Sequence, residues 1–237
     1  TATLERQLQV VVDHVGLYSS EDIEAWCTGA QLLGSGAHAD VYRGVSVNFP
    51  MAIKVLKRGA NKDLLFLREL QVLTAVRDEF LVPLIGVCLD ARALVFPVGR
   101  CTLEEGLAPN GVLASAPSDA VLLLASNVAN GVAALHNRRL VHRDVKSANV
   151  LLFPEPKNPS GFAGQLADFG AARDLDVTST MTVVGTALYI DPMVMQTGRY
   201  SRGSDVFSLG VVVLEALVGA PAGRSARRRP VWQWFAA

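Results

Sequence analysis

The residue types most suited to chemistry crowd one short stretch of the chain, residues 141–152. Asp144, Lys146 and Asn149 stand there between an apolar helical pattern and an apolar strand pattern. A carboxylate can orient a hydroxyl and accept its proton, a lysine can neutralise a transferring phosphate, and an amide oxygen can bind Mg²⁺. A solvated turn is the alternative interpretation, and the motifs elsewhere in the chain argue against it. The stretch therefore predicts a phosphoryl-transfer site.

Two further charged residues would suit the same chemistry. Asp168 follows a short apolar run and precedes Phe169 and Gly170, an order that suits a metal-bridging carboxylate on a movable hinge, although the triplet is also a common turn. Lys54 lies within an apolar strand pattern, where an ammonium is costly unless it meets an anion. A phosphate is one such anion and the carboxylate of Glu69 on the following helix is another. An edge lysine that reaches solvent is the alternative.

A glycine-rich run, Leu33-Gly34-Ser35-Gly36, precedes the strand that carries Val41. Glycines in a strand–turn–strand unit let backbone N–H groups approach phosphate oxygens without a Cβ in the way. An ordinary hairpin turn is the commoner explanation of such a run, so the signal is weak by itself. The run is followed by a strand pattern and not by a helix, which argues against a dinucleotide-binding or Walker loop.

The apolar patterns predict elements of two kinds to hold these residues. Up to residue 98 short strands alternate with Gly, Asn and Pro signals, as in an antiparallel meander, with one helix over residues 63–73. After residue 100 the period of the apolar residues becomes helical. One apolar stripe follows Ser118, which is the expected N-cap of its helix, and a second helix, apolar nearly all round, is expected over residues 206–217. The fold class is therefore α+β. The expected strands are residues 31–33, 40–45, 51–56, 82–89 and 93–98. Two short apolar runs, residues 149–153 and 165–169, lie between the two expected helices.

Composition narrows the class of protein. The chain has 237 residues, of which half are apolar and 19% charged, and its formal net charge is zero. This indicates a packed globule and gives no reason to expect a nucleic-acid or membrane-surface partner. Cys27, Cys88 and Cys101 have no metal-ligand spacing, which suits a reducing compartment. We expect a cytoplasmic location, because no run resembles a signal peptide and residues 206–220 are too short to cross a bilayer, while a longer membrane-associated parent protein stays open.

In their order along the chain, these motifs resemble the signature set of the eukaryotic protein kinase catalytic domain. The similarity runs from about Gly34 to Ala222. It implies a bilobal protein-kinase fold, with a small β-rich N-lobe and a mostly helical C-lobe that is truncated after its central helix. The domains that it implies are a flanking segment at 1–28, the N-lobe at 29–98, a partial C-lobe at 99–222 and a basic, aromatic tail at 223–237.

The resemblance also implies how each matching residue serves the transfer of the γ-phosphoryl group of Mg-ATP to a protein hydroxyl. Asp144 would orient the hydroxyl, Lys146 would lie close to the γ-phosphate, and Lys54 would hold the α- and β-phosphates. The implied catalytic residues are Asp144, Lys146, Asn149, Lys54 and Glu69, and the implied ligands of Mg²⁺ are Asn149 and Asp168. The implied ATP-binding residues are Leu33, Gly34, Ser35, Gly36, Ala39, Val41, Ala52, Lys54, Phe96, Pro97, Gly99 and Leu151.

Asp205 is a carboxylate at the start of the apolar central helix. A carboxylate in such a place needs partners, so we expect it to accept hydrogen bonds from backbone N–H groups. These include N–H groups of the catalytic loop, the polar loop within residues 141–152.

The resemblance extends to the substrate. Lys146, two residues after Asp144, and the Gly185-Thr186 pair resemble Ser/Thr kinases more than tyrosine kinases. We therefore expect a signalling kinase that acts on Ser or Thr hydroxyls of a protein and belongs to the receptor-like/Pelle or tyrosine-kinase-like branch. A phosphate on the activation segment would pair with Arg143 and order that segment. The candidate phosphosites are Thr178, Ser179, Thr180 and Thr182.

The chain departs from the kinase pattern at several points. Ala39 replaces the third glycine of the phosphate loop. This replacement keeps the backbone N–H, so it predicts that ATP binding is weakened and not lost. Met193 stands where the family has a glutamate, and the tail replaces the helices that would follow, so one face of residues 206–220 is expected to be exposed. A catalytically impaired pseudokinase that acts as a binding or scaffold module is the alternative function, although every charged catalytic residue is present.

Overall fold

The computed structural model describes residues 15–46, 49–57, 59, 62–175, 187–219 and 221. The candidate phosphosites at 178–182, the Gly185-Thr186 pair and the tail at 223–237 lie outside the described residues. The chain divides into two units, residues 1–77 with 82–98 and residues 78–81 with 99–237. The first is rich in strands and the second is mostly helical, so the predicted α+β class is confirmed.

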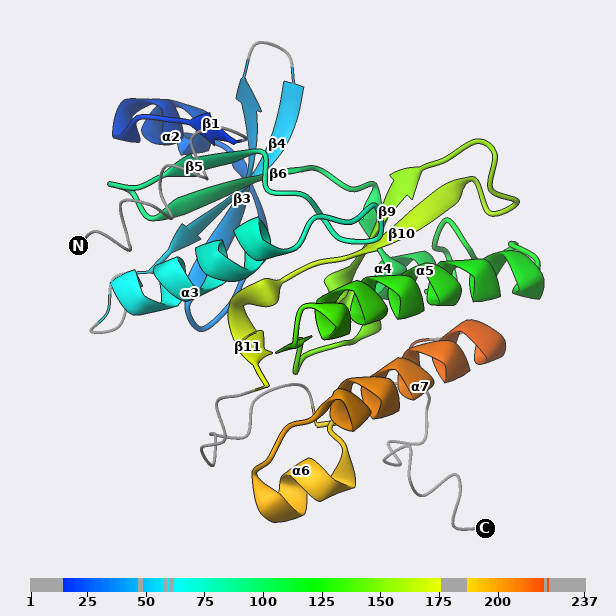
Figure 1. Ribbon diagram of the computed structural model, residues 1–237. Coiled ribbons are helices and arrows are strands. Elements are labelled where there is room, and N and C mark those ends of the chain that lie inside the picture. The colour runs from blue at the N-terminus through cyan, green and yellow to red at the C-terminus, as the bar shows by residue number, and fades with distance from the viewer. Residues whose placement is uncertain are drawn as a thin grey trace. The chain divides into compact units, whose positions relative to one another are not determined.

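A six-stranded sheet forms the framework of the first unit (Figure 1). Its strands lie in the order β1-β5-β6-β4-β3-β2, and all neighbours are antiparallel except β1 and β5. The predicted meander is thus confirmed for β2, β3 and β4. The strands are β1 (Gly16–Leu17), β2 (Gln31–Ser35), β3 (Ala39–Ser46), β4 (Phe49–Leu56), β5 (Gly86–Cys88) and β6 (Ala93–Pro97).

The strand predicted over residues 82–89 is wrong over its first half. Only Gly86–Cys88 pairs in the sheet, while Val82 and Leu84 are buried outside any strand. Pro83 stands between them and has no N–H to donate to a ladder, which accounts for the late start of the strand. The apolar run therefore predicts the burial of these residues correctly, but it predicts their strand pairing wrongly.

Helix α2, Ser20–Cys27, covers one face of this sheet. Its Ile23 packs in a buried cluster with Ile53 of β4 and Val95 of β6. Because side chains alternate along a strand, Lys54 of β4 lies on the opposite face. Part of the segment predicted to flank the N-lobe therefore contributes to the core of the first unit.

Helix α3, Lys62–Ala75, lies on the other side of the sheet from α2 (Figure 1). Its apolar stripe is the one predicted from the sequence, because Phe66, Leu70 and Leu73 are all buried. Glu69 is buried in the same stretch, with 4% of its surface exposed. A carboxylate so placed needs a cationic partner, and the sheet supplies one.

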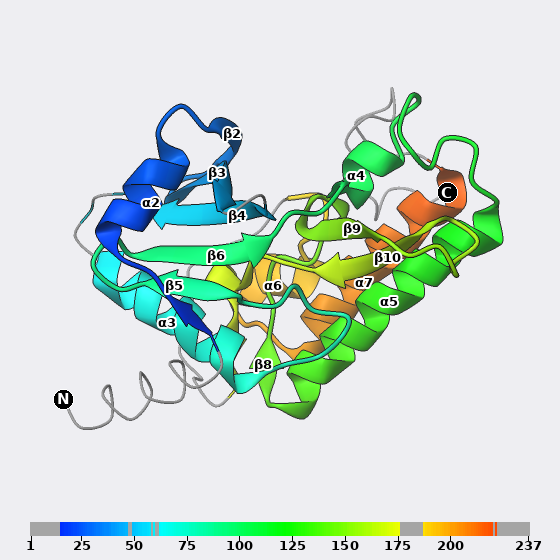
Figure 2. The same ribbon diagram turned by 90° about the horizontal axis from the view of Figure 1, so that it is seen from above.

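The second unit is built on two long helices that pack side by side, α5 (Ser118–Asn137) and α7 (Arg202–Val218) (Figure 2). Strands β10, β9 and β7 form a sheet in that order, and β10 packs on α5. Strands β8 and β11 form a separate antiparallel pair. The remaining elements are β7 (Cys101–Thr102), α4 (Leu103–Gly106), β8 (Leu140–Val141), η1 (Ser147–Asn149), β9 (Val150–Pro154), β10 (Phe162–Leu166), η2 (Phe169–Ala171), β11 (Arg173–Asp174) and α6 (Pro192–Thr197).

Helix α5 is the core helix of the second unit. The predicted N-cap at Ser118 is wrong by one position, because the helix begins at Ser118 and Pro117 is its N-cap, with no side-chain cap. Leu124, Val128 and Leu135 are fully buried. Among the described residues α5 alone is long and apolar enough to cross a membrane by length and composition, and its contacts with α7 and β10 account for that apolar character instead.

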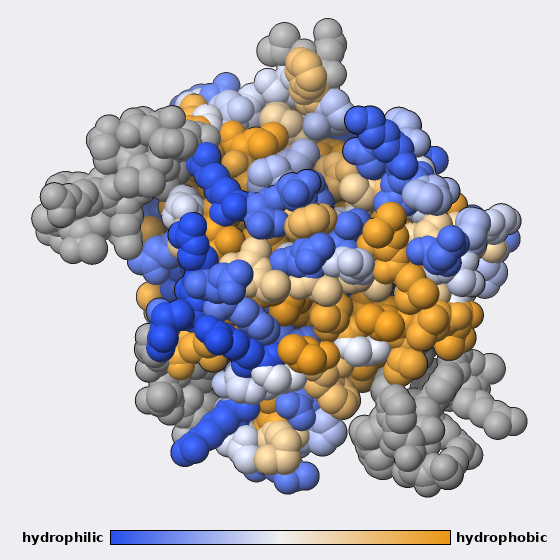
Figure 3. Space-filling view, turned by 45° about the vertical axis from the view of Figure 1, so that its right-hand side comes forward, coloured by the Kyte–Doolittle hydropathy of each residue, from blue (hydrophilic) through white to orange (hydrophobic). Residues whose placement is uncertain are grey.

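Helix α7 buries one face and exposes another. Asp205, Val211 and Val212 are almost completely buried, whereas more than half of the surface of Val206 and of Leu217 is exposed, at 56% and 53%. The exposure predicted for this helix is therefore confirmed. A space-filling view shows where apolar residues gather on the surface that faces the viewer (Figure 3).

Candidate active site

A buried ion pair links the sheet of the first unit to α3. Lys54 Nζ donates to Glu69 Oε1 at 2.6 Å, with 15% of the lysine side chain and 4% of the glutamate side chain exposed. Alternation along β4 turns Lys54 towards α3, and the carboxylate compensates the ammonium in a place that excludes most water. The pairing that the resemblance implied for Lys54 is present, which holds its ammonium at a fixed position.

The glycine-rich run forms the turn between β2 and β3, and the turn itself does not require its glycines. Gly36 N–H donates to Ala39 O at 2.9 Å, and neither Gly34 nor Gly36 has a positive φ. A Cβ added to Gly34 would meet no atom within 4 Å, and one added to Gly36 would meet only Ala39 O at 3.7 Å. Space is therefore open around the loop, as the close approach of a ligand would need.

The residues implied to bind ATP fall into two groups, one in each unit. In the first unit Ala52 of β4 pairs with Phe96 of β6, and Val41 of β3 pairs with Lys54. Val41, Ala52 and Lys54 therefore share a face of the sheet. Leu33 and Ser35 are exposed on β2, Ala39 is buried at the start of β3, and Pro97 ends β6.

In the second unit Gly99 and Leu151 lie side by side. A Cβ added to Gly99 would approach Leu151 Cβ to 3.1 Å and Leu152 O to 3.3 Å, so a larger residue would crowd Leu151 and Leu152. The next residue, Arg100, donates its N–H to Leu152 O at 2.7 Å. Within the described residues the N–H of Gly99 donates to no protein acceptor.

The catalytic loop of the second unit brings two polar side chains, Lys146 and Asn149, to one carboxylate, that of Asp144. Lys146 Nζ donates to Asp144 Oδ2 at 2.7 Å, and Asn149 Nδ2 donates to the same oxygen at 3.0 Å and to Asp144 O at 2.8 Å. The turn η1 brings Asn149 back towards Asp144. The second carboxylate oxygen, Oδ1, is buried and accepts no hydrogen bond from the described residues. The loop thus fixes Asp144 through one oxygen and leaves the other to accept a hydrogen bond.

His142 joins this loop to the segment before Asp168. Its Nδ1 accepts from the N–H of Asp144 at 3.3 Å, so the ring proton is on Nε2, which donates to Ala167 O at 3.1 Å. The imidazole is completely buried and packs edge-on against Phe169, with 5.5 Å between ring centroids. His142 is therefore a structural link between the two motifs.

Asn149 and Asp168 are held near each other by the backbone. The N–H of Ala167, next to Asp168, donates to Asn149 O at 2.8 Å. Asp168 has a left-handed backbone with a φ of 62°, as does Arg143 with a φ of 69°. Such values are uncommon for residues other than glycine and concentrate at functional sites.

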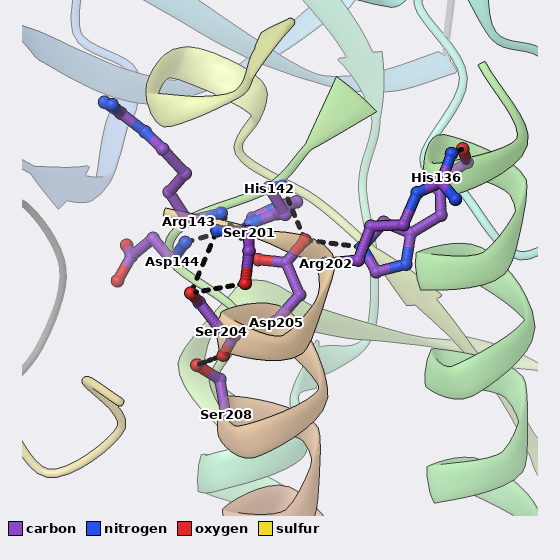
Figure 4. A network of polar contacts seen from close by, with 9 residues as sticks. All are labelled: His136, His142, Arg143, Asp144, Ser201, Arg202, Ser204, Asp205 and Ser208. Carbon is purple, nitrogen blue, oxygen red and sulfur yellow. Dashed lines mark hydrogen bonds and ion pairs between the residues drawn. The ribbon is translucent and has the colours of Figure 1, made fainter. Parts of the chain in front are cut away.

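Asp205 anchors the catalytic loop to α7 (Figure 4). Its Oδ1 accepts from the N–H of Arg143 at 2.9 Å, and its Oδ2 accepts from the N–H of His142 at 2.8 Å. His136 at the end of α5 contacts the same Oδ2 through Nε2 at 2.9 Å. The prediction that Asp205 is satisfied by backbone N–H groups of this loop is confirmed, and His136 is a partner that the sequence did not reveal.

A second buried network joins α7 to the loop through Tyr189. The Tyr189 hydroxyl donates to Glu215 Oε1 at 2.6 Å and lies 3.1 Å from Ser147 Oγ. Ser208 Oγ donates to Tyr189 O at 2.7 Å. Burial, and next the negative charge of Glu215, raise the pKa of the Tyr189 hydroxyl. One sign of this network, an acidic residue inside the apolar helix, is visible in the sequence, but the partner of that residue is not.

The comparisons with known proteins agree with this geometry. A family model described as "Protein kinase domain" matches residues 28–232. The chain therefore belongs to the protein kinase domain family.

Similar proteins include plant receptor-like kinases. The chain is 36% identical over 215 residues to the receptor-like serine/threonine-protein kinase ALE2 of Arabidopsis thaliana, covering 85% of this chain and 26% of that protein. It is 36% identical over 226 residues to the proline-rich receptor-like protein kinase PERK13 of the same plant, covering 90% of this chain and 29% of that protein. A mitogen-activated protein kinase kinase kinase of Drosophila melanogaster is 32% identical over 201 residues, covering 80% of this chain and 17% of that protein. The chain thus spans less than a third of the length of these relatives.

Proposed function

We propose that this chain is a protein serine/threonine kinase that transfers the γ-phosphoryl group of Mg-ATP to a protein hydroxyl. The observation that carries the proposal is the environment of Asp144. Lys146 and Asn149 bind one oxygen of its carboxylate, and the other oxygen is buried and accepts no hydrogen bond from the described residues. A carboxylate that is fixed through one oxygen and keeps the other free of hydrogen bonds is what a substrate hydroxyl needs for orientation and for loss of its proton.

The remaining polar residues suit the phosphates. Lys54, held by Glu69, offers a localised positive charge to the α- and β-phosphates. The turn at Gly34 and Gly36 leaves room for oxygens close to its backbone. Lys146 lies 2.7 Å from Asp144, so it is placed to neutralise charge on the phosphoryl group that the hydroxyl attacks.

The oxygens of Asn149 and Asp168 fit Mg²⁺. Asn149 turns its Nδ2 towards Asp144, which leaves its amide oxygen without a partner among the described residues. Mg²⁺ prefers oxygen ligands and is usually held by one or two protein groups together with substrate phosphates and water. No group of three or more His, Cys, Asp and Glu suited to a metal occurs in the described ranges. When bound, Mg²⁺ would neutralise charge on the phosphates.

The expected acceptor is a Ser or Thr hydroxyl. Lys146 supports this, as do the relatives named receptor-like serine/threonine-protein kinase and receptor-like protein kinase. We place the chain in the receptor-like branch, acting in signalling from the cytoplasm. The proposed domain limits are an N-lobe at 29–98 and a partial C-lobe at 99–222.

Calorimetric titration with a non-hydrolysable ATP analogue tests the nucleotide site. We expect the full chain to bind the analogue in the presence of Mg²⁺. Chelation of Mg²⁺ should weaken binding at least about tenfold, because Asn149 and Asp168 would hold the metal and the metal would neutralise charge on the phosphates. Asp168→Asn should weaken binding in Mg²⁺ but not after chelation, and Asn130→Ala, on the exposed face of α5, should bind like the wild type. Equal heats with and without Mg²⁺ would contradict the proposed metal ligands.

A further inference from the structure

Lys57 makes a set of contacts that the nucleotide site as proposed does not use. It stands just after β4, and its N–H donates to His38 O at 2.8 Å, which prolongs the β3–β4 ladder by one residue pair. Its Nζ then reaches across the turn between β2 and β3. It donates to Ser35 Oγ at 3.0 Å and to Gly36 O at 2.8 Å, and it forms an ion pair with Asp40 Oδ1 at 3.1 Å.

These contacts fix the glycine-rich turn from outside. Within the part of the chain that the structure describes, Lys57 supplies every hydrogen bond that reaches residues 35–38 from beyond the β2–β3 hairpin. The turn has one internal backbone bond, from Gly36 N–H to Ala39 O. Hydrogen bonds from Ser35 and then Lys57 lower the pKa of Asp40, so the carboxylate at the base of the turn stays charged and keeps its hold on the ammonium.

The side from which Lys57 approaches determines which way the turn presents its N–H groups. Val55, two residues before Lys57, packs on the cluster beneath α2, whereas Lys54 points to α3. Lys57 continues this alternation and so approaches from the α2 side. Because a trans peptide is planar, a Gly36 carbonyl directed at Lys57 turns the N–H of Ala37 to the opposite side, the side of Lys54. The ammonium therefore orients a backbone donor towards the face where the phosphates are proposed to bind.

We propose that Lys57 is a positioning residue for ATP, which holds the glycine-rich turn in its phosphate-binding conformation through Ser35, Gly36 and Asp40. This inference rests on the proposed kinase function. Its physical basis is preorganisation: a turn that is ordered before the nucleotide arrives loses less conformational freedom on binding. The pair is a surface contact, with 38% of the lysine side chain and 26% of the aspartate side chain exposed, so it contributes little to global stability.

Steady-state kinetics with Lys57→Met, Lys57→Arg and the matched control Lys157→Met tests the proposal. Lys157 is exposed on the turn between β9 and β10, and removal of its charge should change nothing. We expect Lys57→Met to raise KM for ATP about five- to tenfold while kcat changes by less than about twofold, because the lost contacts order the binding loop and touch no reacting atom. Lys57→Arg should recover most of the wild-type KM, since a guanidinium can also bridge the carbonyl and the carboxylate.

Two outcomes of the kinetic comparison would overturn the proposal. One is a KM for ATP in Lys57→Met equal to that of Lys157→Met, and the other is equal losses in Lys57→Met and Lys57→Arg with a marked fall in thermal midpoint. The second result would identify a merely structural lysine. Hydrogen exchange in the absence of nucleotide separates this inference from the kinase function itself. Lys57→Met should increase amide exchange at residues 35–39 whether or not the protein binds ATP, and unchanged exchange would refute the contact. A wild-type chain that fails to bind Mg-ATP would refute the proposed function and the ATP role of Lys57 with it.

Discussion

Replacement of Asp205 by alanine tests most sharply how the structure holds its catalytic loop. The carboxylate is 1% exposed and accepts from the N–H groups of His142 and Arg143 at 2.8 and 2.9 Å. Asp205→Ala leaves both buried donors without a partner, at about 1–3 kcal/mol each, which gives a loss of roughly 2–6 kcal/mol in the free energy of unfolding. That is a large part of the ~5–15 kcal/mol typical of a domain.

Urea unfolding followed by tryptophan fluorescence and circular dichroism measures this loss. Asp205→Asn should cost less, about 1–3 kcal/mol, because its amide keeps one oxygen that accepts from one of the two N–H groups. Asp90→Asn is the control, an exposed carboxylate whose replacement should change stability by no more than about 0.5 kcal/mol. In the fraction that stays folded, Asp205→Asn should lower kcat by about a hundredfold, since small displacements of catalytic groups have effects of that size. A loss below about 1 kcal/mol for Asp205→Ala would refute the reasoning.

Three further changes have distinct expected outcomes. Gly34→Ala should leave stability unchanged or raise it by up to about 1 kcal/mol, because its Cβ meets open space and φ is not positive, yet it should weaken ATP binding in calorimetry; a destabilised protein with normal binding would contradict this. Lys54→Met should lower the free energy of unfolding by roughly 1–3 kcal/mol, because it leaves a buried carboxylate without this cation. In urea unfolding, the double variant Lys54→Met/Glu69→Leu should recover part of this lost free energy. The pKa of Tyr189 is raised, so the folded state binds the hydroxyl proton more tightly than the unfolded state does. The stability that results is fully present below the unfolded pKa of about 10 and is lost as pH rises above that value. In an ultraviolet titration up to about pH 11, Tyr189→Phe and the wild type should therefore show the same amplitude of tyrosine ionisation, because Tyr189 does not ionise in that range. A smaller amplitude in Tyr189→Phe would mean that Tyr189 ionises like an exposed tyrosine.

The sequence predicts those parts of the site that follow from local chemical necessity. A lysine inside an apolar strand and a glutamate inside an apolar helix each need a partner, and Lys54 and Glu69 prove to be each other's. An acidic residue at the start of an apolar helix needs backbone donors, and Asp205 finds them in the catalytic loop. In each case burial of a charge makes the contact obligatory, so the residue type carries the information.

The parts that escaped prediction depend on tertiary arrangement or on one backbone detail. Lys57 looks like any surface lysine, and its hold on the glycine-rich turn follows only from the β3–β4 register. Tyr189 meets Glu215 because the segment before α6 crosses α7, which no periodicity reveals. Pro83 shortens a strand whose apolar pattern continues through it, because burial and hydrogen bonding are separate requirements.

Phosphoryl transfer from labelled ATP to a generic basic protein, compared between the wild-type chain and Asp144→Asn, tests the central claim most directly. Asp144→Asn preserves the size of the side chain and removes the carboxylate that would accept the hydroxyl proton. We predict Mg²⁺-dependent label on Ser and Thr of the acceptor with the wild type, and a loss of at least about a hundredfold with Asp144→Asn. Equal incorporation by the two proteins, or none by a wild type that is folded and binds Mg-ATP, would contradict the claim that this site is a working kinase centre.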